Sequence, residues 1–462
     1  MAYYVSEYYK YWKSENIREA GSTQGGYYVY THGTSGPNTV TVSEAHGYGM
    51  IIFALMAGTH AYADPEAKKY FDGMYDFFRD HPSRFSENLM TWAVNSNGSG
   101  GETFNEGYTA TDGDLDIAYA LVLAHYQWGS EGRIDYLSEA KSVINAIKSY
   151  EINQNNKRVM ICDSYDWTNE GQREVSRCSD WMTDHFQTFY EVTNDSFWKS
   201  VASNIYSMYS SLSSSYSPNT GLVPDFINGT PPSPYSYDGK THYSYDACRF
   251  PWRIATDFIH NKNSSAKTVC AKIGNWAIDE AAGDPYNLKA EYQLNGTAVN
   301  DFSSAAFMAP FLCACSAVST AASQALIDKG WSILKVEKEE YYEDSINLLC
   351  LLLLSGNWWK PEPYTDISTT QNTGPSSFTF SVAQALKNRV TVSYTLPKTG
   401  NIQLSIYSSN GKLVRSVTEG YRSCGAHTAT IGLNNGSFSN GIYLATLSVD
   451  GARYTVRFNI VK

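Results

Sequence analysis

The chain has 462 residues, a length that suits one large domain with a small one appended. Its formal net charge is −11, and residues 378–462 hold nine Lys or Arg against two Asp or Glu, a balance of +7, so the rest carries −18. Such an acidic body argues against nucleic-acid binding and suits a neutral or cationic partner.

Two kinds of helical pattern alternate from the start of the chain to Trp359. One kind is amphipathic and fits a half-exposed helix: Glu7–Ile17, Pro65–Arg79, Tyr136–Ser149, Asp195–Leu212, Ala266–Ala282 and Thr320–Leu334. The other kind is apolar on almost every side: Ser43–Gly58, Asp112–Trp128, Asp180–Tyr190, Asp246–Ile259, Asp301–Cys315 and Tyr342–Ser355. A helix that is apolar all round must be wrapped by others. The alternation therefore predicts two concentric rings of six helices, an all-α (α/α)6 barrel over residues 1–359.

The composition changes after the barrel. Residues 360–377 are rich in Pro, Thr, Ser, Asn and Gly and indicate a linker. Residues 378–462 then contain five β-type segments separated by turn residues. These segments are Val390–Tyr394, Ile402–Tyr407, Thr428–Leu433, Ile442–Val449 and Tyr454–Ile460. They predict a small all-β sandwich as the C-terminal domain.

Three of the predicted inner helices begin with an acid in a distinctive setting: Glu44 in Val-Ser-Glu-Ala-His-Gly, Asp112 in Ala-Thr-Asp-Gly-Asp, and Asp246 in Tyr-Ser-Tyr-Asp-Ala-Cys-Arg. In a barrel of this kind the inner helices run in one direction, so Glu44, Asp112 and Asp246 gather at one face. The helices that carry Glu44 and Asp246 are the first and fourth of six, so these two acids lie on opposite walls. Two carboxyl groups facing across a gap of about 6.5–9.5 Å are typical of inverting glycoside hydrolysis, in which one protonates the leaving oxygen and the other activates water.

The surroundings of the two acids predict which has which role. A helix N-terminus favours an ionised carboxylate, so a general acid there needs its pKa raised. The negative charge of Asp112 and desolvation by bound sugar can raise the pKa of Glu44. Arg249, one turn after Asp246, favours the charged form of Asp246. This asymmetry favours Glu44 as the acid and Asp246 as the base.

The segment Ala110–Trp128, which begins Ala-Thr-Asp-Gly-Asp-Leu-Asp-Ile-Ala, fits the signature of glycoside hydrolase family 8. The resemblance continues through residues 43–50, 246–253 and 341–345. It implies an (α/α)6 barrel and an inverting, endo-acting hydrolase of β-1,4-linked polysaccharides. By the same resemblance Glu44 is the general acid, Asp246 the base, and Asp112 the carboxylate that holds the sugar at the cleavage point.

Further positions resemble substrate-binding residues of the family. Trp92 matches a sugar-stacking Trp, although a Trp in a loop can equally fill the core, and both interpretations stay open here. Arg249 and Tyr342 match residues that form hydrogen bonds near the cleavage site. We expect Trp181 and Tyr245 to pack in the core.

The family divides by the position of its base. Members such as chitosanases lack an acid at the position of Asp246 and use a Glu from an inserted loop, so Asp246 favours the cellulase and xylanase branch. The sequence departs from part of the family at Asp180, where some members have Tyr. A sugar contact by Asp180 is therefore left open.

The C-terminal segment Gly400–Lys462 resembles the sorting domains of secreted bacterial proteins. A carbohydrate-binding domain is the alternative, but this segment has no Trp for stacking. Either role implies a secreted or cell-surface protein, although no signal peptide opens this chain. An apolar run such as Leu348–Leu354 is too short to cross a bilayer.

The eight Cys residues show neither Cys-x-x-Cys nor paired Cys and His spacing, so no metal site is indicated. A disulfide between Cys162 and Cys178 stays open.

These patterns together predict a secreted, monomeric, inverting endo-β-1,4-glucanase that acts on cellulose or mixed-linkage β-glucan without metal or organic cofactor. An endo-β-1,4-xylanase is the close alternative, because the two substrates share an equatorial backbone and differ in one hydroxymethyl group. A protein that binds polysaccharide without cleaving it is the alternative from another class.

Overall fold

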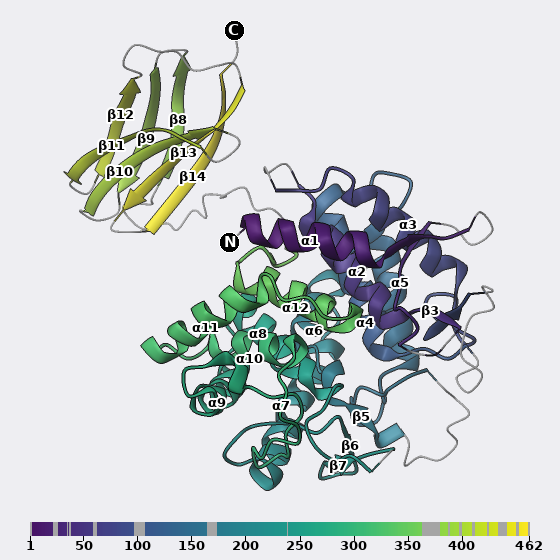
Figure 1. The fold of residues 1–462 in the computed structure, drawn as a ribbon. Coiled ribbons are helices and arrows are strands. Elements are labelled where there is room, and N and C mark those ends of the chain that lie inside the picture. The colour runs from purple at the N-terminus through teal and green to yellow at the C-terminus, as the bar shows by residue number, and fades with distance from the viewer. Residues whose placement is uncertain are drawn as a thin grey trace. The chain divides into compact units, whose positions relative to one another are not determined.

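The computed structural model describes the chain except for residues 1, 22–25, 35, 37, 59–61, 97–106, 164–172, 238, 363–378, 387–388, 397–399, 409–411, 423–424, 433–440, 450–451 and 461–462. The described residues form a helical unit that ends at residue 362 and a β unit that begins at residue 379. Most of the predicted linker at 360–377 lies outside the described residues. Figure 1 labels the helices and strands of these units.

The helical unit contains twelve α-helices within the part of the chain that is described. They are α1 (Ala2–Asn16), α2 (Ser43–Met56), α3 (Ala67–Asp80), α4 (Thr111–Trp128), α5 (Tyr136–Tyr150), α6 (Thr183–Thr193), α7 (Phe197–Tyr216), α8 (Phe250–Asn261), α9 (Ser264–Ala281), α10 (Ala305–Cys315), α11 (Ala321–Leu334) and α12 (Tyr341–Leu354). None of these described helices is both long and apolar enough to span a membrane.

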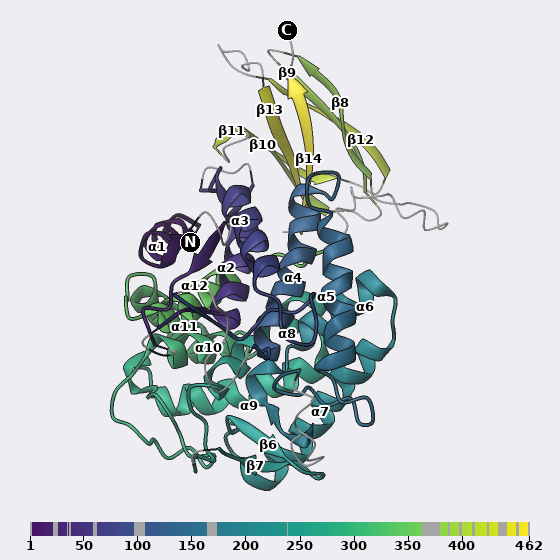
Figure 2. The ribbon, with the colours of Figure 1, turned by 90° about the vertical axis from the view of Figure 1, so that its right-hand side faces the viewer.

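The six apolar helices form a closed inner ring. Going round it, α2 packs on α4, α4 on α6, α6 on α8, α8 on α10, α10 on α12, and α12 on α2. Each of the first five inner helices is followed by an outer one that packs on it, as α3 does on α2 and α5 on α4 (Figure 2). The sixth outer position is filled by α1, which packs on α12 from the other end of the chain. The predicted (α/α)6 barrel is confirmed.

Three inner helices begin later than the sequence pattern predicts. The helix expected from Asp180 begins at Thr183, because Cys178–Asp180 forms a separate 3-10 turn. The helix expected from Asp246 begins at Phe250, after a 3-10 turn over Ala247–Arg249. The helix expected from Asp301 begins at Ala305, where the side chain of Ser304 caps it. Asp180 and Asp246 therefore lie on connecting segments rather than in helices.

Two glycines let the N-terminal turns of α2 and α4 touch. A Cβ atom on Gly113 would lie 2.5 Å from the backbone carbon of Ser43, and one on Gly47 would lie 2.6 Å from Cβ of Asp116. No larger residue fits either position without moving the backbone. This close approach brings the helix starts that carry Glu44 and Asp112 side by side.

Short β-ribbons lie near the same ends of the inner helices. β3 (Thr39–Val42) runs directly into α2 and pairs with β4 (Ala93–Asn95). β5 (Ser176–Arg177) pairs with β6 (Phe226–Asn228), which pairs with β7 (Ser233–Tyr235). A third ribbon joins β1 (Ile17–Glu19) to β2 (Tyr27–Val29). The first two ribbons carry or adjoin residues of the site described below.

A buried ion pair joins three inner helices. Arg253 on α8 donates from Nη1 and Nη2 to the two carboxylate oxygens of Asp116 on α4, at 2.7 and 2.6 Å. His185 on α6 lies 2.9 Å from the same carboxylate. All three side chains are almost completely buried. The carboxylate of Asp116 therefore has its charge matched inside the barrel.

We expect Asp116→Asn to lower the free energy of unfolding by about 3–5 kcal/mol, because it leaves the guanidinium of Arg253 buried and unpaired. Asp76 is the matched control, since both of its carboxylate oxygens accept hydrogen bonds from Arg133 in a bidentate ion pair on the surface. Asp76→Asn should cost less than about 1 kcal/mol. Urea unfolding measures both variants, and equal losses would contradict this account of the buried pair.

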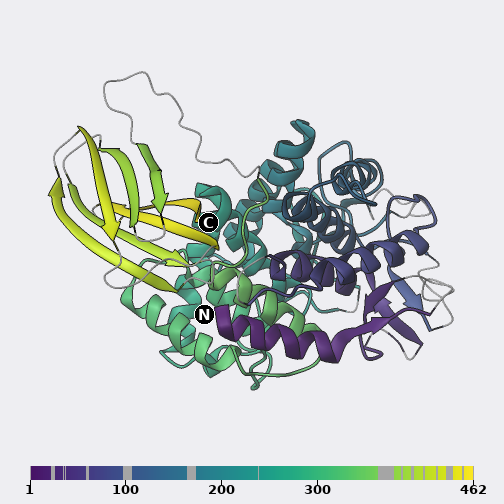
Figure 3. The same cartoon turned by 90° about the horizontal axis from the view of Figure 1, so that it is seen from above.

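The β unit consists of two antiparallel sheets. One sheet has the strand order β11-β10-β13-β14 and the other β12-β9-β8. The strands are β8 (Thr379–Leu386), β9 (Arg389–Leu396), β10 (Gly400–Ser408), β11 (Leu413–Arg422), β12 (Gly425–Gly432), β13 (Gly441–Val449) and β14 (Ala452–Ile460). Side chains from both sheets share one apolar core, and Figure 3 shows the strands in two layers. The predicted sandwich is confirmed, but β8 and β11 are not among the five predicted strands.

Candidate active site

A cavity of about 790 Å³ opens where the inner helices begin. Its wall includes Glu44 at the start of α2, Asp112 at the start of α4, and Asp246 just before α8. The three acids that the sequence singles out therefore meet in one cavity. A volume of this size admits a bound sugar with solvent beside it.

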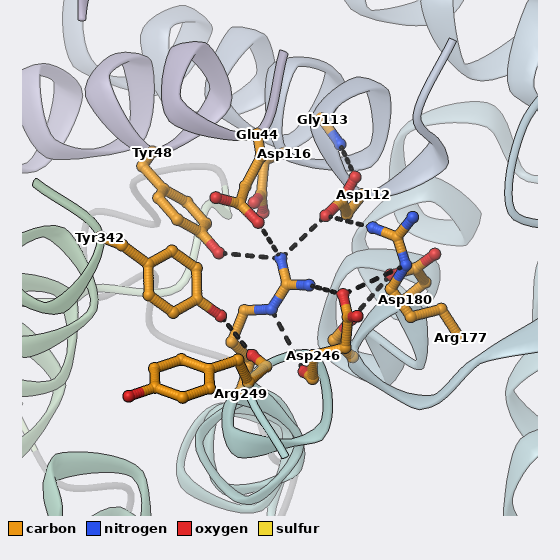
Figure 4. Close-up of polar contacts among 12 residues, drawn as sticks. Glu44, Tyr48, Asp112, Gly113, Asp116, Arg177, Asp180, Asp246, Arg249 and Tyr342 are labelled. Carbon is orange, nitrogen blue, oxygen red and sulfur yellow. Dashed lines mark hydrogen bonds and ion pairs between the residues drawn. The ribbon is translucent and has the colours of Figure 1, made fainter. Parts of the chain in front are cut away.

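Arg249 lies at the centre of the three acids (Figure 4). Its Nη1 donates to Glu44 Oε2 and, at 2.8 Å, to Asp112 Oδ2. Its Nη2 donates to Asp246 Oδ1 at 3.0 Å. Only 1% of the Arg249 side chain is exposed, so its position is fixed by these contacts and by Tyr48, whose hydroxyl lies 3.2 Å from Nη1. One guanidinium thus sets the spacing of three carboxyl groups.

The same contacts limit the gap between Glu44 and Asp246. Their carboxyl groups bond to different terminal nitrogens of one planar guanidinium, so the bonded oxygens are separated by at most about 8 Å. The limit leaves room only for the lower part of the range of about 6.5–9.5 Å that is typical of inverting hydrolysis. The two side chains also differ in exposure, at 13% for Glu44 and 33% for Asp246.

Burial and charge shift the pKa of two of these acids in opposite directions. Burial raises the pKa of Glu44 to about 7, against the lowering effect of Arg249 and with help from the charge of Asp112. Burial also acts to raise the pKa of Asp112, but Arg177 and Arg249 together outweigh it and hold that pKa below its ordinary value. Near neutral pH, Glu44 is therefore the carboxyl able to keep a proton while Asp112 stays charged.

The predicted substrate-binding residues all line the cavity. Trp92 is partly buried; its backbone N–H donates to the carbonyl of Tyr108 and its carbonyl accepts the N–H of Ser43, which fixes the segment that carries it. Tyr342 donates its hydroxyl to the carbonyl of Tyr245 and places its ring 5.9 Å from the guanidinium carbon of Arg249. Trp92 both lines the cavity and packs against the apolar core, so its position agrees with both interpretations.

Two further residues of the site were missed by the sequence argument. Arg177 on β5 donates from Nη1 to Asp112 Oδ2 at 3.0 Å, and its Nε lies 3.5 Å from Asp246 Oδ1. Tyr341 donates its hydroxyl to Glu44 Oε1 at 3.0 Å. Both line the cavity. The tyrosine pair at the start of α12 is a signal that could have indicated Tyr341, whereas nothing near Arg177 in the sequence marks it.

Three expectations about nearby residues have mixed outcomes. Trp181 is fully buried and donates to Ser176, as expected of a core residue. Tyr245 is 36% exposed and lines the cavity, so its predicted place in the core is wrong. Asp180 is buried against Ser179 and is not among the residues that line the cavity, which gives no support to a sugar contact.

The sulfur atoms do not form the disulfide that the sequence left open. The thiol of Cys178 is free and buried, so no bridge links it to Cys162. Among the described residues, no group of three or more His, Cys, Asp or Glu side chains is placed to hold a metal ion.

The paired acids over a sugar-sized cavity on an (α/α)6 barrel define the class of protein as a glycoside hydrolase. Residues 5–369 match the family described as glycosyl hydrolases family 8, and the chain belongs to that family. Membership excludes the alternative of a protein that only binds polysaccharide. Residues 386–462 match the secretion system C-terminal sorting domain.

The relatives agree with this assignment. The chain is 38% identical over 370 residues to an endoglucanase of Bacillus sp. (strain KSM-330), covering 78% of this chain and 77% of that protein. It is 39% identical over 357 residues to a beta-glucanase of Niallia circulans, covering 75% and 83%. A solved beta-1,3-1,4-glucanase from Paenibacillus sp. X4 is 38% identical with a TM-score of 0.71, covering 77% of this chain and 92% of that one.

Proposed function

We propose that the protein is an inverting endo-β-1,4-glucanase that hydrolyses cellulose or mixed-linkage β-glucan. The observation that carries the proposal is the placement of Glu44 and Asp246 in one cavity, on different nitrogens of Arg249. The relatives named endoglucanase and beta-glucanase support a glucan substrate and endo action.

In the proposed reaction Glu44 donates its proton to the oxygen of the leaving sugar as the glycosidic bond breaks. Asp246 accepts a proton from the water whose oxygen forms the new bond to the anomeric carbon. Asp246 is the most exposed of the three acids, so water has access to it. Asp112, charged and held by two guanidinium groups, accepts hydroxyl hydrogen bonds from the sugar at the cleavage point.

We propose that Trp92 stacks on a sugar ring and that Arg249 and Tyr342 hydrogen-bond beside the cleavage site. All three line the cavity with the acids. The chemistry assigned to these side chains uses no metal or organic cofactor. A sorting domain at the C-terminus supports export to the cell surface or the medium, where a polymer substrate is found. We propose that the enzyme acts there as a monomer, with residues 1–359 as its catalytic domain and 378–462 as its sorting domain.

The experiment that tests the substrate measures reducing-sugar release from carboxymethyl cellulose, barley β-glucan, xylan and chitosan in parallel. We expect more reducing sugar from carboxymethyl cellulose and barley β-glucan than from xylan and chitosan. The viscosity of the glucan solutions should fall early in the reaction, as endo cleavage requires. Dominant turnover of xylan would contradict the glucanase assignment and favour the xylanase alternative. Asp246→Asn serves as the blank for contaminating activities on every substrate.

A further inference from the structure

Asp225 lies directly behind the turn that carries Asp246. Its Oδ1 accepts the backbone N–H of Ser244 at 3.0 Å and that of Ala247 at 2.8 Å, so its two hydrogen bonds span Asp246. The side chain is 8% exposed and is not among the residues that line the cavity. Asp225 therefore acts on the backbone of the turn and not on the contents of the cavity.

The backbone of Asp225 ties the same turn to the strand that carries Arg177. Its carbonyl accepts the N–H of Cys178 at 3.0 Å, and its own N–H donates to the carbonyl of His242 at 3.1 Å. The next residue, Phe226, pairs with Arg177 in the β5–β6 ribbon. One residue thus connects the two segments whose side chains meet where Arg177 Nε lies 3.5 Å from Asp246 Oδ1.

We propose that Asp225 is a positioning residue, which holds the turn of residues 244–247 so that Asp246 points at the water it activates. The inference rests on the proposed role of Asp246 as base. The N–H groups at the start of a helical turn lack partners within it, and a carboxylate that accepts two of them fixes its geometry. Precision matters because a misplacement of about 1 Å can cost about 100-fold in rate.

A second acid holds the segment from the other side but does not span Asp246. Glu291 Oε2 contacts His242 Nε2 at 2.8 Å and Ser244 Oγ at 3.0 Å, and both side chains come before Asp246 in the chain. With Asp225 removed, Glu291 still holds the segment, and the carbonyls of Tyr245 and Asp246 still accept from Tyr342 and Arg249, but the N–H groups of Ser244 and Ala247 lose their shared acceptor. The fold should therefore survive while Asp246 is held less precisely.

An asparagine can replace Asp225 without losing the acceptor. Burial, followed by the nearby charge of Asp246, raises the pKa of Asp225 to about 7. The carboxyl is therefore partly protonated near neutral pH, and the uncharged amide has the same shape and one oxygen in the place of Oδ1. Asp225→Asn is the conservative variant, and Asp225→Ala removes both hydrogen bonds.

The test compares kcat and KM for cellohexaose in the full-length enzyme. We expect Asp225→Ala to lower kcat about 30- to 100-fold with KM within about 3-fold, and Asp225→Asn to restore kcat to within about 5-fold of the parent. Asp257→Ala is the matched control, because Asp257 is a buried acid that accepts from Asn261 and Asn263 at the far end of α8. It should lower the melting temperature without lowering kcat.

A double variant separates this inference from the proposed function. If Asp225 acts through Asp246, adding Asp225→Ala to Asp246→Asn should lower the residual kcat by less than about 3-fold. A full further loss, an unchanged kcat in Asp225→Ala alone, or no recovery in Asp225→Asn would overturn the inference while leaving Asp246 as the base. A parent-like kcat in Asp246→Asn would overturn the proposed function, and this inference with it.

Discussion

Replacing Asp246 by Asn is expected to lower kcat on barley β-glucan by about 1,000-fold, because general-base catalysis contributes about 100- to 10,000-fold and an amide cannot accept the proton from water. The amide oxygen can still accept the hydrogen bond that Arg249 Nη2 now donates to Asp246 Oδ1. The position of Arg249, and with it Glu44 and Asp112, should therefore be preserved. Reducing-sugar release by the purified variant measures the loss.

Substrate binding is the control for this variant. Because Asp246→Asn changes charge and not shape, cellohexaose should bind with a Kd within about 5-fold of the parent when measured by calorimetry. A kcat within 10-fold of the parent would contradict the assignment of Asp246 as base. Loss of binding together with kcat would instead place Asp246 among the groups that hold the substrate.

Replacing Glu44 by Gln should lower kcat by about 1,000-fold on β-glucan, for which the departing sugar hydroxyl must be protonated. A 2,4-dinitrophenyl β-cellotetraoside should be far less affected, because its leaving group departs without a proton. The single oxygen of the amide can accept from Tyr341 or from Arg249 Nη1 but not from both, while Asp112 and Asp246 still bind Arg249 and hold it in place. Equal losses on the two substrates would contradict the role of Glu44 as the acid.

The pH dependence of the parent enzyme should follow the same residue. The pKa of Glu44 is raised to about 7. Because only the protonated carboxyl can act as the acid, kcat/KM should fall as pH rises through about 7. The falling limb should be absent in Glu44→Gln acting on the dinitrophenyl substrate. A falling limb that persists there would assign it to another group.

The sequence predicts the barrel well because its signal is local to each helix. An inner helix such as α4 is apolar on every side and an outer one such as α3 on one side only, so the two rings can be distinguished without knowing the contacts. The missed strands β8 and β11 both lie at a sheet edge. The edge position alone does not explain this, because the edge strands β12 and β14 overlap predicted segments; in β11 the charged residues of Leu413–Arg422 weaken the apolar alternation.

The residues of the site also differ in how well the sequence predicts them. Glu44, Asp112 and Asp246 stand out because each lies in a distinctive motif at the start of an apolar segment. Arg177 has no such signal, since its partners Asp112 and Asp246 lie more than 60 residues away on either side. The two-residue strand β5 that carries it is defined only by pairing with β6. Contacts of this kind depend on the tertiary fold, and so does the hydrogen bonding of Asp225.

The stereochemistry of the first product tests the central claim most directly. Proton NMR spectra recorded during the first minutes of cellohexaose hydrolysis distinguish the α- from the β-anomer before the two interconvert. Water activated by Asp246 on the face opposite the leaving group must give the α-anomer first, with the β-anomer appearing only by mutarotation. Initial release of the β-anomer would contradict the account, because it would require a covalent sugar intermediate on one of these acids.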